Sequence, residues 1–261
     1  MPTSARSHAS SASALLVAVL AVAAAVPAAA TERPVVWVQA GHQEPREPGY
    51  RAQTGAGTGP FGDEIGFTTR VAPRVAAILR RHGVRALTTP GLVRPLGGRG
   101  AAFVSVHHDA PGGRLVVGHA VTGASENYYR GEGFGAPSST PYPDSAPHRR
   151  ATRVGPKVAT LSRRLANRTA RQLRRVATRP NGLRSGFGGV ADGANRRVTR
   201  YYGFYRTRAD ARIIVEAGAA GADDRFLART DLISRAVAAG VLRHLRAEGE
   251  LPPRRRASPA R

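Results

Sequence analysis

The sequence predicts a single-domain α/β fold in which helices cover both faces of a largely parallel sheet. Short apolar runs of strand length alternate along the chain with longer segments of helical periodicity, and this alternation is typical of strands connected through helices. A chain of 261 residues, with 41% hydrophobic and 22% charged residues, can bury one sizeable core. In such a fold the functional site is expected at the carboxyl edge of the sheet.

Six apolar runs have the length and composition of strands. They are Val35 to Gln39, Val84 to Thr88, Ala102 to His107, Leu115 to His119, Tyr201 to Tyr205 and Ile213 to Glu216. Between them, apolar residues recur at helical spacing from Ile65 to Leu79, from Val158 to Leu173 and from Leu232 to Leu245. Pro73 lies inside the first helical segment, so we expect a kink there or a regular helix that begins near the proline.

The start of the chain has the composition of a targeting segment. Residues 1–30 combine Arg6, a short apolar stretch and a run of small residues that ends at Ala30. This pattern is typical of a secretory signal peptide that is cut near Ala30, and an uncleaved membrane anchor is the alternative. We therefore expect an extracytoplasmic protein, secreted to the cell wall or periplasm, with no stable membrane anchor.

The rest of the chain is expected to form one catalytic or binding domain, residues 31–251. Within it, residues 119–153 are rich in Gly, Pro, Ser and Tyr and show no clear periodicity, which predicts a long loop insertion. This loop either borders a substrate groove or is a flexible insertion without a role. Residues 252–261 are expected to be a disordered basic tail.

The charge of the chain limits its partners. The formal net charge is +23, and Lys157 is the only lysine, so nearly every cation is an arginine. Such a balance favours nucleic acid, acidic membrane surfaces and anionic wall polymers alike. An aromatic content of 6% argues against a stacking platform for single-stranded nucleic acid, so we expect no nucleic-acid partner. We also expect the protein to be a monomer. The chain has no cysteine, so any metal must be held by His, Asp or Glu.

Four residues with metal-binding or acid–base side chains fall at the expected edge of the sheet. His42 follows the first strand, Glu64 opens the first helix, and His107 and Glu216 end two further strands. Two imidazoles and a carboxylate with a fourth position left for water form a catalytic zinc arrangement, and a further carboxylate is the usual base. Each residue also has a simpler explanation: His42 as a loop residue, and Glu216 as the partner of an arginine. His107 and His108 are adjacent in a strand and point to opposite faces, so one of them at most joins the cluster.

The order of these motifs resembles that of a known family. The motifs are Val38 to His42, Glu64 at a helix start, Val104 to Ala110 and Ile213 to Gly218. In this order they resemble the zinc-dependent N-acetylmuramoyl-L-alanine amidases of the bacterial cell wall (amidase type 3). The similarity extends over about residues 35–246, and it implies a twisted, mixed and mostly parallel sheet of six strands flanked by helices.

The resemblance also implies an activity and a site. It implies His42, Glu64 and His107 as ligands of Zn2+ and Glu216 as the catalytic acid and base. The reaction is hydrolysis of the amide bond between N-acetylmuramic acid and the L-alanine of the peptidoglycan stem peptide. Peptidoglycan is then the substrate, and anionic wall polymers are candidate partners for the arginines.

Several positions depart from the family pattern. Gln39 stands where the family has Asp, Asp109 where it has Asn, and Gln43 and Glu44 replace glycines, whereas all three ligands are kept. Contributions of His108, Asp109 and Glu44 to the site stay open. Two alternatives also stay open: a secreted cationic wall-polymer-binding protein without catalysis, and another zinc-dependent peptidase or amidase. The His-x-x-Glu pair of many zinc peptidases would need an acid at position 45, which is Pro45.

Overall fold

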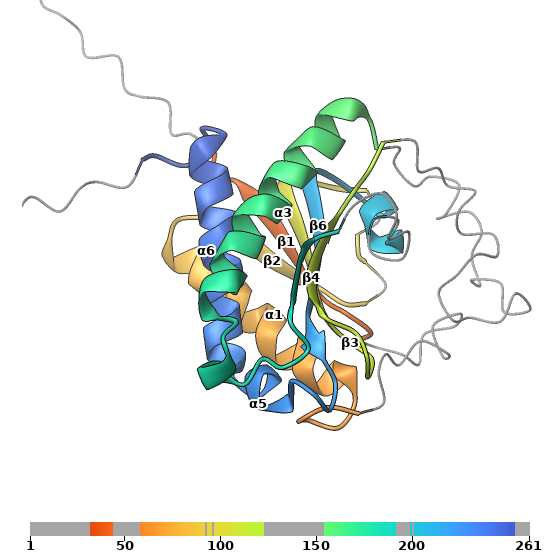
Figure 1. Cartoon of the computed structure of the whole chain (residues 1–261). Helices are drawn as coiled ribbons and strands as arrows, with labels where there is room; N and C mark the ends of the chain where they lie inside the picture. The colour runs from red at the N-terminus through yellow and green to blue at the C-terminus, as the bar shows by residue number, and fades with distance from the viewer. Residues whose placement is uncertain are drawn as a thin grey trace, which may run out of the picture. The chain divides into compact units, whose positions relative to one another are not determined.

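The computed structural model describes residues 32–43, 58–91, 93–95, 97–122, 154–191, 199 and 201–253 (Figure 1). Apart from Glu32, these residues belong to one unit, Arg33–Arg261. The expected signal peptide lies outside the described residues, as do most of the loop at 119–153 and of the basic tail. In the part of the chain that is described, no helix is long and apolar enough to cross a membrane.

Six strands form one mixed sheet with the order β2-β1-β3-β6-β4-β5. The strands are β1 (Val35–Ala40), β2 (Arg85–Thr89), β3 (Gly98–Asp109), β4 (Leu115–His119), β5 (Phe187–Val190) and β6 (Thr207–Ala219). β2, β1, β3 and β6 run parallel to one another, whereas β4 is antiparallel to β6 and parallel to β5. The predicted six-stranded, mixed and mostly parallel sheet is confirmed.

The helices pack mainly against one face of this sheet, as Figure 1 shows for the three long ones. The helical elements are α1 (Glu64–Arg81), α3 (Pro156–Val176), α5 (Asp224–Leu227) and α6 (Thr230–Ala247), with the 3-10 helices η2 (Arg179–Asn181) and η3 (Tyr202–Tyr205). The larger core cluster joins this face to the long helices through buried aliphatic side chains, among them Val38, Val104, Ile213, Leu79, Leu165 and Val237. The smaller cluster lies on the opposite face, where Phe103 and Ile214 pack against Phe204 and Tyr205. Within the described residues, this second face is thus covered by η3 and its neighbours rather than by a long helix.

The observed elements differ from the predicted ones in three places. Tyr201 to Tyr205 is not a strand, because its aromatic rings pack onto the second face of the sheet instead of pairing along an edge. Gly203 permits this close approach, since a side chain there would press on the rings of Tyr201 and Phe103. β5 was not predicted, because Gly188 and Gly189 give its four residues little strand propensity. The first helix begins at Glu64 rather than near Pro73, which lies inside it.

Candidate metal centre at the carboxyl edge of the sheet

The turn after β1 is held by hydrogen bonds to two other elements. The Gly41 N–H donates to the Val106 carbonyl of β3 (3.1 Å), and the Thr68 hydroxyl of α1 donates to the Gly41 carbonyl (2.7 Å). A side chain at position 41 would overlap the imidazole ring of His107, so only glycine fits. The next residue, His42, has a φ of 59°, in the left-handed region that non-glycine residues rarely adopt. The turn therefore directs the His42 side chain towards His107 at a conformational cost.

Glu64 reaches the same point from the start of α1. Asp63 is the N-cap of this helix, because its Oδ1 accepts the Gly66 N–H at 3.0 Å. Glu64 is therefore in the first helical turn, where the helix dipole favours a negative charge. Its Oε1 also accepts the backbone N–H of His108 at 3.2 Å, which fixes the carboxylate against β3.

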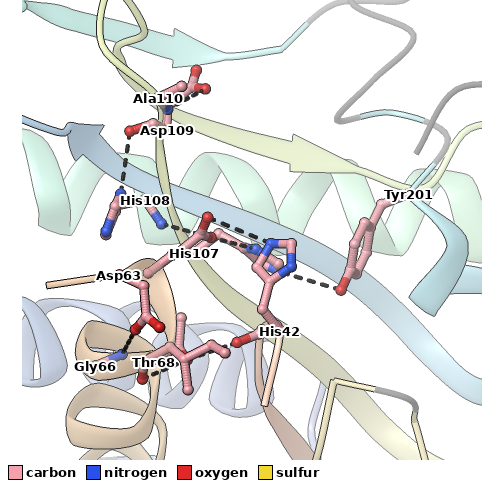
Figure 2. Close-up of polar contacts among 12 residues, drawn as sticks. His42, Asp63, Gly66, Thr68, His107, His108, Asp109, Ala110 and Tyr201 are labelled. Atoms are coloured by element: carbon pink, nitrogen blue, oxygen red, sulfur yellow. Dashed lines mark hydrogen bonds and ion pairs between the residues drawn. The ribbon is translucent and has the colours of Figure 1, made fainter. Parts of the chain in front are cut away.

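His107 completes the cluster from β3. Its Nδ1 lies 2.7 Å from Glu64 Oε1, and His42 Nε2 lies 3.4 Å from Glu64 Oε2. The His42 and His107 rings meet edge to face with their centroids 4.8 Å apart. One candidate ligand atom from each of the three residues lies within 4.8 Å of the others. Figure 2 shows the His42 and His107 rings close together, with Thr68 of α1 below them.

The protonation of the cluster suits a cation. Burial would raise the pKa of Glu64, but hydrogen bonds and charges from His107 and His42 outweigh it and hold that pKa well below the usual value. Burial lowers the pKa of His107, against the opposing effect of Glu64. An ionised carboxylate thus faces a His107 imidazole that favours the neutral form, which is the state in which each of these residue types binds metal. The donor set of two imidazoles and one carboxylate, without cysteine, fits Zn2+ with an open position.

Glu216 lies beside this cluster on the neighbouring strand. His107 of β3 and Glu216 of β6 are paired in parallel register, so their side chains leave the same face of the sheet. On its other side, Glu216 is registered with Val116 of β4. Glu216 is 6% exposed, so its carboxylate is buried close to the three clustered residues without being one of them. The structure therefore brings all four sequence-predicted residues to one edge and groups three of them tightly.

The sequence left open whether His108, Asp109 and Glu44 contribute to the site. His108 and Asp109 have structural contacts. His108 belongs to the cluster only through its backbone N–H, because its ring points to the helix-covered face and packs edge-on against Phe67. Asp109 Oδ1 accepts the N–H of Ala110 at 2.8 Å, and its carbonyl accepts the N–H of Ala220 at 2.9 Å. The first contact lies in the turn after β3, and the second joins the end of β3 to the residue that follows β6. Glu44 lies outside the described residues.

Sequence reasoning missed two residues that support the cluster, Thr68 and Tyr201. Thr68 anchors the turn at Gly41, as described above. The Tyr201 hydroxyl lies 3.1 Å from His107 Nε2 and donates to Gln39 Oε1 at 2.9 Å. Thr68 could have been recognised from the sequence, because it is a hydroxyl residue among the apolar positions of the first helix. Tyr201 carried no comparable signal, because it lies 94 positions after His107 in the chain.

The fold and this site define an α/β protein with a His-Glu-His centre at the carboxyl edge of a mixed sheet. Among solved structures, the CwlD amidase from Clostridioides difficile, in complex with the GerS lipoprotein, has a TM-score of 0.51 and 12% identity, covering 82% of this chain and 100% of that one. The N-acetylmuramyl-L-alanine amidase Ami1 from Mycobacterium smegmatis has a TM-score of 0.50 and 16% identity, covering 82% and 97%. Cwp6 from Clostridium difficile has a TM-score of 0.50 and 13% identity, covering 82% and 29%.

This chain therefore has the fold of the N-acetylmuramoyl-L-alanine amidases, and the resemblance seen in its four sequence motifs is confirmed at the level of the fold. No family model matches the sequence, and no curated protein matches it significantly. At such low sequence identity, the activity has to be argued from the site itself.

Proposed function

We propose that this protein is a zinc-dependent N-acetylmuramoyl-L-alanine amidase. The reaction is hydrolysis of the amide bond that joins the lactyl group of N-acetylmuramic acid to L-alanine in peptidoglycan. The observation that carries the proposal is the convergence of His42, Glu64 and His107 at one sheet edge, with Glu216 in register beside His107. The shared fold with solved amidases supports the choice of substrate.

The four residues divide into ligands and a proton carrier. His42, Glu64 and His107 would hold the zinc ion, which when bound lowers the pKa of a water molecule and polarises the amide carbonyl. The Glu216 carboxylate accepts the proton of the attacking water at one of its oxygens. It then returns this proton to the departing amine of L-alanine, so that one residue acts as base and then as acid. Burial of Glu216 keeps bulk water from competing for the proton.

The site is costly to keep in a protein that only binds anionic polymers. Glu64 and His107 are each 3% exposed and Glu216 is 6% exposed, so two carboxylates and an imidazole are buried at one edge of the sheet. Buried carboxylates destabilise a fold unless they are paired or bind metal. A cationic binding surface needs none of these groups, whereas a metal hydrolase needs all of them. The amidase proposal accounts for this burial and the binding-protein alternative does not.

We also propose that the protein acts outside the cytoplasm, after cleavage near Ala30. The signal-peptide pattern of residues 1–30 supports this location, and the arginine-rich composition supports contact with anionic wall polymers. N-terminal sequencing of the protein from the culture medium of a producing bacterium tests the location. A mature chain that starts near Thr31 is expected, and an intact Met1 on a membrane-bound protein would contradict the proposal.

Digestion of purified peptidoglycan tests the activity. We expect the zinc-loaded protein to release stem peptides with a free N-terminal L-alanine, detected by mass spectrometry, and a chelator to stop the release. The Glu216→Gln variant should keep bound zinc and lose at least about 100-fold in rate, because it keeps the shape of the side chain without the base. Glu248→Gln is the matched control, since Glu248 pairs with Arg168 on the helix layer and its loss should leave the rate unchanged. Equal release by wild type and Glu216→Gln would exclude Glu216 as the proton carrier.

A further inference from the structure

The His107 ring has a hydrogen-bonding group at each of its two nitrogens. Nδ1 lies 2.7 Å from Glu64 Oε1, and Nε2 lies 3.1 Å from the Tyr201 hydroxyl. A neutral imidazole carries a proton on only one nitrogen, and the partners of the two nitrogens decide which one. The hydrogen-bond partner of the Tyr201 hydroxyl therefore determines which nitrogen of His107 has a lone pair that can bind a metal.

The direction of these hydrogen bonds is fixed by the amide of Gln39. Its Nε2 donates to the Gly91 carbonyl, so its Oε1 is turned towards Tyr201. This oxygen accepts the Tyr201 hydroxyl proton at 2.9 Å. A phenol has a single proton, so the Tyr201 oxygen can only accept at His107, and Nε2 must donate. The lone pair of Nδ1 then faces the Glu64 carboxylate.

We infer that Tyr201 and Gln39 are positioning residues that keep the proton of His107 on Nε2 and thereby make Nδ1 its metal-binding nitrogen. This inference rests on the zinc site of the proposed function. An ionised carboxylate only accepts hydrogen bonds, so with the proton on Nε2 the Nδ1 lone pair and Glu64 Oε1, 2.7 Å apart, are two donor atoms that would both be available to a metal cation. Metal-bound histidines commonly donate their other N–H to an outer partner, which fixes the ring and raises its affinity.

The packing around Tyr201 suits a fixed role. Gln39 is fully buried and Tyr201 is 3% exposed. The Tyr201 ring meets His107 edge-on at 5.2 Å between centroids and Phe204 edge-on at 5.6 Å, so neighbours hold it on two sides. Little rotamer freedom is lost when zinc binds, because the hydrogen-bonded chain is already formed.

The test measures zinc affinity and the His107 proton separately from activity. Zinc affinity is measured by competition with a chromophoric chelator for wild type, Tyr201→Phe, Gln39→Met and the double variant. Each single variant should bind zinc about 10- to 100-fold more weakly. The double variant should be no weaker than Tyr201→Phe, since both changes break one chain. Tyr205→Phe, which removes a buried hydroxyl from the 3-10 helix that follows Tyr201, is the matched control and should bind like wild type.

Nitrogen-15 NMR of the His107 ring gives the second readout, with His107→Gln assigning the signals. A hydrogen-bonded Nε2–H is expected in wild type with and without zinc. This N–H should exchange faster in Tyr201→Phe and stay protected in Gln39→Glu, because a carboxylate still accepts the Tyr201 proton. Unchanged zinc affinity in Tyr201→Phe, or an unprotonated Nε2 in wild type, would overturn the inference. If wild type binds no zinc, the proposed function fails, and the Nε2–H signal alone decides the role of Tyr201 and Gln39.

Discussion

Gly41, in the turn after β1, lies directly against the imidazole ring of His107 of β3. This contact explains why Gly-His follows β1. The chain has to pass over the His107 ring before His42 can turn back to it. Glycine removes the side chain that would block the passage, and the left-handed backbone at His42 makes the turn.

Replacing Gly41 by alanine should therefore displace His107. The methyl group would overlap the ring, so we expect a loss of about 2 kcal/mol or more in the free energy of unfolding, together with weaker zinc binding. Urea unfolding and chelator competition measure the two effects. Gly155→Ala is the control, because a methyl group there meets open space and should cost less than about 1 kcal/mol. Equal stability and zinc affinity of Gly41→Ala and Gly155→Ala would contradict the described contact.

Glu64→Gln should separate metal binding from folding. The substitution removes a buried carboxylate that pairs with both imidazoles but keeps a similar shape, so the metal-free variant should fold with a lower melting temperature than wild type. Zinc should raise the melting temperature of wild type and not that of the variant, since a ligand stabilises only the state that binds it. Differential scanning calorimetry with added zinc or with a chelator measures this. Glu248→Gln should respond to zinc like wild type, and a zinc response in Glu64→Gln would remove Glu64 from the site.

His244 should make the protein sensitive to acid, independently of the site. Burial, and next the charge of Arg168, lower the pKa of His244 from 6.5 to about 4, against the opposing charge of Glu248. Below pH 6.5 the unfolded chain binds a proton that the folded chain resists, so stability falls as the pH drops towards 4. Between pH 7.5 and pH 5 the expected loss from His244 is about 2 kcal/mol.

His244→Gln tests this linkage. Glutamine does not titrate and can still accept the hydrogen bond that Arg168 Nη1 makes to His244 Nδ1 at 3.0 Å. Urea unfolding at both pH values should show a smaller loss for the variant than for wild type. His82→Gln, at the exposed end of α1, serves as the control and should lose as much as wild type. If the free energies of unfolding of wild type and His244→Gln fell equally with pH, the buried imidazole would not be the source of the acid sensitivity.

Gly240→Ala should weaken the packing of α6 on α3. A methyl group at Gly240 would lie 2.5 Å from the Thr169 Cα, which is backbone and cannot rotate away. The two helices would have to separate, and we expect a cost of about 1 to 3 kcal/mol. Thermal unfolding measures the cost. Zinc affinity should stay at the wild-type value, because both helices pack away from the metal centre; a lower affinity would show that the helix layer also holds the site.

Local sequence patterns determined the sheet and the residues at its edge. Apolar runs separated by helical segments predicted parallel strands, and parallel strands bring their carboxyl ends to one side. Alternation along β3 then placed His107 and His108 on opposite faces. For this reason His42, Glu64, His107 and Glu216 could be assigned to one site from spacing and family resemblance, before any distance was known.

The tertiary structure alone decided what surrounds those residues. Tyr201 reaches His107 only because its segment folds over the second sheet face as part of an aromatic cluster, whereas local propensity favoured a strand. Thr68 holds the turn at Gly41 only because α1 packs beside β1. Such contacts join residues that are distant in the chain and depend on how whole elements pack, which no local pattern encodes. The sequence by itself thus predicted which residues meet at the candidate centre, and the packing of elements decided how those residues are held.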